Sequence, residues 1–136
     1  MSIRKKLYLI IPPIAFLFLD AAITLIGQSA EYWIDHIHVV ESNPLSAYFL
    51  TCGPGFFIVE QLLMAIAIGF LVAYVPRQIT LLASISFVLG HAFGFLTWML
   101  WKYGMFWFIY IYFPLIALIV IWQVRMYYKH KDAMRR

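Results

Sequence analysis

The chain has 136 residues, of which 65% are hydrophobic and only 12% are charged. A water-soluble domain carries roughly 25% charged residues, so this composition excludes an ordinary soluble domain and predicts a polytopic membrane protein. The net charge of +4 does not indicate nucleic-acid binding, because the basic residues lie at the ends of apolar spans. The single cysteine, Cys52, excludes an intrachain disulfide and a multi-cysteine metal site.

Four apolar spans are expected in one integral membrane domain that covers residues 1–136. They lie at about residues 7–27, 45–75, 79–101 and 105–124. The first is longer than the roughly 7–15 residues of a signal-peptide core, so we expect a retained helix. The second is interrupted at Cys52-Gly-Pro-Gly55, which should kink or break a helix. A polar outer loop, 28–44, follows the first span, and a basic tail, 125–136, follows the last.

The distribution of lysine and arginine predicts the orientation. If both termini and the turn at 76–78 are cytoplasmic, Lys102 is the single basic residue on the outer side. This agrees with the positive-inside rule. The predicted fold class is therefore all-α: a transmembrane four-helix bundle with both termini in the cytoplasm.

Three ionisable residues lie inside the predicted spans: Asp20, Glu60 and His91. A charge at membrane depth costs roughly 2.5–3.5 kcal/mol, and such residues usually face the bundle interior and pair with one another. The helical rise places all three toward the outer side, with Thr24 one turn from Asp20 on the same face. The sequence thus predicts an outward-facing polar pocket.

Carboxylate and imidazole are both common metal ligands. Asp20, Glu60 and His91 are therefore candidate ligands for a divalent metal ion, and His36 and His38 in the outer loop are two more. No tight ligand motif such as H-E-x-x-H supports this site.

Each of these residues also has a structural interpretation. Asp20 could hold a buried hydrogen-bond network, Glu60 could extend to the interface, and His91 could be a neutral core histidine. His36 and His38 could be solvated loop residues. Gly90 and Gly94 form a small-xxx-small pair, which is typical of helix packing.

Two short motifs accompany the polar residues: Asp20-Ala-Ala-Ile-Thr24 in the first span, and Glu41-Ser-Asn43-Pro44-Leu45 before the second, with Gly53 beyond it. This combination resembles a family of small bacterial and archaeal membrane proteins of unknown function, with a D-x-x-x-T and an E-x-N-P signature. The resemblance covers about residues 15–60. It implies a four-helix protein of the prokaryotic cytoplasmic membrane and adds Glu41 and Asn43 to the candidate ligand-binding residues, but it implies no activity.

The second motif also has a direct physical interpretation. Asn43 is a good helix N-cap, and Pro44 is suited to the first helical position. A carboxylate such as Glu41 is favoured near the positive end of a helix. If the loop folds down, Glu41 and Asn43 could instead close the polar pocket over Asp20 and Thr24.

Three functional hypotheses follow. The first is a protein that binds or conducts a cation, a proton or a small polar ligand. The second is an intramembrane hydrolase that uses a metal or a carboxylate to activate water. The third is an accessory or scaffold subunit whose polar cluster only fixes helix packing. The catalytic residues are unknown, the lipid bilayer is the expected partner, and a homo-oligomer or a larger membrane complex is possible.

Overall fold

The structure, a computed structural model, describes residues 6–132. Within that range it is all-helical and has no β-strand. Four helical segments are long and apolar enough to cross a membrane. They are α1 (Leu7–Gly27), α4 (Pro54–Tyr74), α5 (Arg77–Trp101) and Phe106–His130, which joins the 3-10 turn η2 (Phe106–Phe108) to α6 (Ile109–Asp132). The predicted all-α class and the number of spans are confirmed.

The two ends of the predicted domain, residues 1–5 and 133–136, lie outside the described residues. The predicted outer loop contains the short helix α2 (Ala30–Ile34). The predicted second span comprises α3 (Pro44–Thr51) and α4, and the chain between them passes through Gly53 at φ +117°. Toward the other end of the chain, α6 continues through the predicted tail as far as Asp132.

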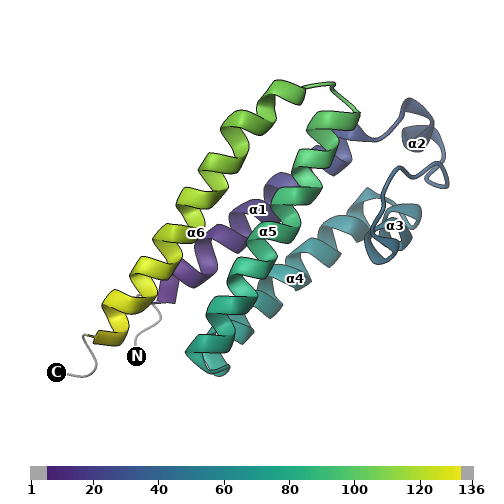
Figure 1. The fold of residues 1–136 in the computed structure, drawn as a ribbon. Coiled ribbons are helices and arrows are strands. Elements are labelled where there is room, and N and C mark those ends of the chain that lie inside the picture. Colours follow the sequence, from purple (N-terminus) through teal and green to yellow (C-terminus); the bar gives the residue numbers. More distant parts are fainter. Residues whose placement is uncertain (1–5, 133–136) are drawn as a thin grey trace.

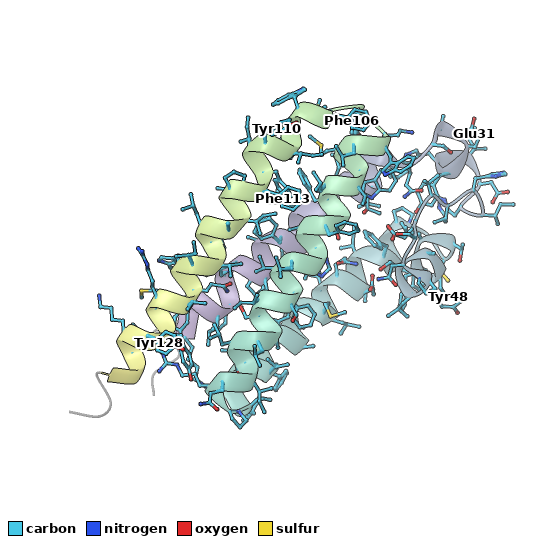
Figure 2. The ribbon with its side chains drawn as sticks, viewed as in Figure 1. Glu31, Tyr48, Phe106, Tyr110, Phe113 and Tyr128 are labelled. Carbon is cyan, nitrogen blue, oxygen red and sulfur yellow. The ribbon has the colours of Figure 1, made fainter. Side chains whose placement is uncertain are left out.

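Helix α1 is the central element. In the most apolar stretch of α1, 33% of the residues are buried inside the protein. The corresponding share for the Phe106–His130 segment is 17%. Helix α5 packs along α1, with α4 and α6 on either side (Figure 1). Helices α4 and α5 leave their short connection together and then diverge, so that α1 closes the back of a V-shaped opening (Figure 1). The outside of the bundle carries exposed apolar side chains, such as Tyr110 on α6 (Figure 2).

Two prolines in α1 require help from the neighbouring helices. Pro12 and Pro13 have no N–H group, so the carbonyls of Tyr8 and Leu9 lose their helical donors. Gln123 Nε2 donates to Tyr8 O at 3.0 Å, and Ser84 Oγ donates to Leu9 O at 2.9 Å. Gln123 Nε2 also lies 2.8 Å from Ser84 Oγ. These bonds join α1 to α5 and α6.

Arg77 extends this set of contacts. Its Nε and Nη2 donate to the Tyr8 hydroxyl at 2.9 and 2.6 Å, and Nη2 donates to Tyr127 O at 3.1 Å. The guanidinium also lies 4.9 Å from the centre of the Tyr127 ring. We call Tyr8, Arg77, Ser84, Gln123 and Tyr127 the proline clamp.

The start of α3 confirms the interpretation of Asn43 and Pro44 as a helix start. The Asn43 side chain accepts a hydrogen bond from Leu45 N at 3.1 Å, and Pro44 is the first helical residue. This cap fixes where the outer segment 41–46 turns back toward α1.

Candidate functional site

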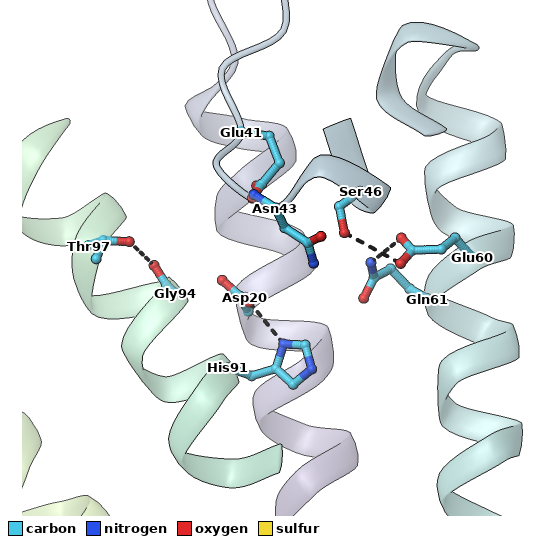
Figure 3. A network of polar contacts seen from close by, with 9 residues as sticks. All are labelled: Asp20, Glu41, Asn43, Ser46, Glu60, Gln61, His91, Gly94 and Thr97. Carbon is cyan, nitrogen blue, oxygen red and sulfur yellow. Dashed lines mark hydrogen bonds and ion pairs between the residues drawn. The ribbon is translucent and has the colours of Figure 1, made fainter. Parts of the chain in front are cut away.

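An acid–base pair lies between the two central helices. Asp20 of α1 and His91 of α5 face one another, with Asp20 Oδ2 2.9 Å from His91 Nδ1 (Figure 3). Their side chains are 20% and 22% exposed, and they form an ion pair when His91 is protonated. An ionised carboxylate only accepts, so in that state of Asp20 it is His91 Nδ1 that donates, and Nε2 is left for another partner.

Gly94 makes room for this carboxylate. A Cβ atom at Gly94 would lie 2.7 Å from both carboxylate oxygens of Asp20. The glycine pair was interpreted from sequence as a packing surface, but Gly94 accommodates a charged group and Gly90 has open space where its Cβ would be. A side chain at Gly94 would displace the Asp20 carboxylate, and a side chain at Gly90 would occupy the open space beside it.

The Asp20–His91 pair lines a cavity of about 610 Å³. This volume falls within the range of ligand pockets, roughly 300–1,000 Å³. The lining residues come from α1, the outer segment 41–46, α4 and α5. They are Asp20, Ala21, Thr24, Glu41, Ser42, Asn43, Ser46, Phe57, Gln61, Ala83, Ser86, Phe87, Gly90, His91, Phe93, Gly94, Thr97 and Trp98. The cavity therefore occupies the opening between α4 and α5.

Thr24 contributes a free hydroxyl to this cavity. Its side chain is only 3% exposed, and the hydroxyl makes no hydrogen bond within the described part of the chain. Because Thr24 lines the cavity, its hydroxyl can donate a hydrogen bond to a bound molecule or accept one from it. Thr97, also in the lining, is instead bonded to Gly94 O at 2.6 Å.

The outer segment closes the cavity above the pair. Figure 3 shows Glu41 and Asn43 over Asp20. Glu41 Oε1 accepts a hydrogen bond from Asn43 N at 2.7 Å. Burial raises the pKa of the Glu41 carboxyl, and the negative charges of Asp20 and Glu60 raise it further.

Glu60 belongs to a separate hydrogen-bonded set and does not line the cavity. It is 7% exposed, accepts from Gln61 Nε2 at 2.6 Å and lies 3.4 Å from Ser46 Oγ (Figure 3). Its contacts orient Gln61 and Ser46, which do line the cavity. The structure therefore brings together Asp20, His91, Thr24, Glu41 and Asn43 of the predicted residues, and places Glu60 behind them.

The predicted metal site is not supported. Among the side chains of residues 6–130 there is no group of three or more histidine, cysteine or acidic residues arranged to hold a metal ion. Asp20 has one histidine partner, and Glu60 is directed at Gln61. His36 Nδ1 lies 2.8 Å from Tyr32 O, and His38 is exposed in the outer loop.

Sequence reasoning missed Gln61, Ser46 and Trp98. Gln61 had a signal, because an amide inside an apolar span is as unusual as the carboxylate beside it. No sequence signal pointed to Trp98. Its indole ring packs against Gly27, where a Cβ atom would overlap the ring.

In the Asp20–His91 pair, the carboxylate orients the imidazole. The pair can therefore accept a proton or provide a negative charge opposite a bound cation. No serine, threonine or cysteine among residues 6–132 is hydrogen-bonded to His91, so these residues form no nucleophile–histidine dyad. No family model matches the chain, and no curated protein or solved structure is significantly similar to it. The family resemblance of the two motifs stays a prediction.

Proposed function

We propose that this chain is a multi-pass protein of a prokaryotic cytoplasmic membrane that binds a small organic cation in the cavity at Asp20. Both termini are assigned to the cytoplasm from the lysine and arginine distribution, so that the end of the cavity with Asp20 and Glu41 lies toward the outer side. The observation that carries the proposal is the Asp20–His91 pair, which lies on the wall of a ligand-sized cavity.

The charges of the lining favour a cation. Asp20 and Glu41 are two carboxylates, and His91 is the single basic side chain among the lining residues. With both carboxylates ionised, the cavity keeps at least one negative charge whether His91 is neutral or protonated. Intramembrane carboxylates mark ion and substrate sites when no fixed cation neutralises them.

The remaining lining suits an organic cation. Phe57, Phe87 and Trp98 place aromatic rings along the cavity. Such rings attract ammonium groups, and tryptophan does so most strongly. The Thr24 hydroxyl and the Asn43 amide add hydrogen-bonding capacity beside the carboxylates.

The scaffold hypothesis is less well supported. The proline clamp already joins α1 to α5 and α6 through the carbonyls that need partners. The Asp20–His91 pair compensates for no such missing bond, and a side-chain pair that only fixed packing would not need a cavity next to it.

The test is binding of tetramethylammonium to the purified protein in lipid nanodiscs, measured with a radiolabelled probe. Asp20→Asn keeps the shape of the side chain and removes its charge. Because opposite charges about 4 Å apart near a protein surface attract one another by roughly 4 kcal/mol, we expect the affinity to fall at least about tenfold.

Asp35→Asn is the matched control, since Asp35 is an exposed carboxylate of the outer loop that does not line the cavity. It should bind tetramethylammonium as the wild type does. Equal affinities of the wild type and Asp20→Asn, or no binding by the wild type, would overturn the proposal.

A further inference from the structure

The cavity is long and changes character along its length. Its lining on α5 runs from Ala83 to Trp98, which at about 1.5 Å per residue spans roughly 22 Å. The end near Trp98 holds the two carboxylates, the histidine and the amides. In the part beyond His91, toward Ala83, Ser86 is the single polar side chain of the lining.

The apolar part opens sideways. Ser86 and Gly90 line this part of the cavity and are exposed on α5. A Cβ atom at Gly90 would meet nothing within 4 Å. Helices α4 and α5 diverge along this stretch, and no other helix within residues 6–132 is drawn between them on the side away from α1 (Figure 1). Gly90 lies near the middle of α5, at the depth where a membrane presents hydrocarbon.

We infer that the ligand is an amphiphile with an ammonium head group and a single alkyl chain, and that it enters between α4 and α5 from the bilayer. The head group lies against Asp20 and Glu41, and the chain lies along α5 past Gly90. This inference rests on the proposed function, because it assigns the same carboxylates to the head group.

Charge and polarity favour this occupant over a second copy of the chain. A neighbouring copy would offer mostly apolar side chains at this depth, and these would bring no positive charge to Asp20 and Glu41. An ammonium head group satisfies the carboxylates, while an alkyl chain fills the apolar part without adding a polar group to the membrane interior.

The experiment compares decyltrimethylammonium with tetramethylammonium in the nanodisc assay, with uptake by empty nanodiscs subtracted. We expect the long-chain probe to bind at least about tenfold more tightly, because each buried CH₂ contributes roughly 0.8 kcal/mol and part of its chain stays near lipid either way. Decyl sulfate, which has the same chain and a negative head group, should bind far more weakly than decyltrimethylammonium.

Gly90→Phe fills the apolar part and should reduce the affinity ratio of the two cationic probes toward one. Ser86→Leu, which narrows the same space with a smaller change, should reduce the ratio less. Leu89→Phe is the matched control: Leu89 is 49% exposed on the same helix but does not line the cavity, and its substitution should leave the ratio unchanged.

A ratio near one in the wild type, or an unchanged ratio in both Gly90→Phe and Ser86→Leu, would overturn the inference while Asp20-dependent tetramethylammonium binding still stood. A wild-type protein that forms a dimer, and that Gly90→Phe converts to a monomer, would overturn it in favour of a second copy. Loss of Asp20-dependent binding for both probes would remove the proposed function itself.

Discussion

The polar groups at the two ends of α1 behave differently. In the proline clamp, the Ser84 hydroxyl and the Gln123 amide nitrogen donate to the backbone carbonyls that Pro12 and Pro13 leave without helical donors. Near the other end, Asp20 bonds to one histidine and the Thr24 hydroxyl is free, with a cavity of about 610 Å³ beside them.

This difference separates structural from functional polarity in a membrane protein. A polar group inside a bilayer is retained when it compensates for a missing backbone bond or when it serves a ligand. The proline clamp meets the first condition, and we propose that the cavity meets the second. The comparison predicts that substitutions in the clamp change stability and that substitutions in the cavity change binding.

The largest effect is expected in the clamp. Gln123→Leu removes the donor to the Tyr8 carbonyl and should lower the free energy of unfolding by about 2 kcal/mol, because it leaves a buried acceptor unpaired. Pro12→Ala restores an N–H that can reach the same carbonyl, so the double variant Pro12→Ala/Gln123→Leu should recover part of the loss. Denaturation in mixed detergent micelles measures both, and equal losses in the single and double variants would contradict this account of the clamp.

A smaller effect, and one on binding, is expected at Gly94. In Gly94→Ala the new methyl group meets the Asp20 oxygens, so the carboxylate must move and the affinity for tetramethylammonium should fall about tenfold, or about 1.4 kcal/mol. Gly69→Ala is the control, because a Cβ atom at Gly69 meets nothing within 4 Å. An unchanged affinity in Gly94→Ala would show that the ligand does not depend on the position of Asp20.

A weaker effect is expected from Glu41 through pH. Because burial raises its pKa above the unfolded value of about 4.3, the stability linked to Glu41 is present below that value and is lost as pH rises through the raised pKa. The melting temperature of the wild type should therefore fall over this interval, and Glu41→Gln should remove that part of the slope. An identical slope in both proteins would contradict the burial of Glu41 over the cavity.

The smallest effect is expected at Glu31, in the same outer loop. Hydrogen bonding from its own backbone N–H and from Ser29 lowers the pKa of this exposed carboxyl, so any linked stability has the opposite sign and is lost only as pH falls through the lowered value. Glu31→Gln should leave both the melting temperature and tetramethylammonium binding unchanged. A loss of binding in this variant would extend the site beyond the cavity.

Much of the fold could be predicted from the sequence because the bilayer imposes long apolar helices. Asp20 and His91 could be identified for the same reason, since a charge in an apolar span is conspicuous. The contacts of Glu60 with Gln61 and Ser46 could not be predicted from the sequence, because they depend on where α3 packs against α4. The roles of Ser84 and Gln123 were also hidden, although Pro12 and Pro13 indicate that two carbonyls need donors from elsewhere.

The most direct test of the central claim is the shift in melting temperature that tetramethylammonium produces, measured side by side for Asp20→Asn and Gln123→Leu. Ligand binding to the folded state stabilises it by RT ln(1 + L/Kd), where L is the free ligand concentration, and so raises the melting temperature as L exceeds Kd. The account predicts that Gln123→Leu melts at a lower temperature than the wild type but keeps the ligand-induced shift, and that Asp20→Asn melts near the wild type but loses it. A shift that persists in Asp20→Asn, or one that disappears in Gln123→Leu while that protein is still folded, would contradict the separation of a structural clamp from a ligand-binding cavity.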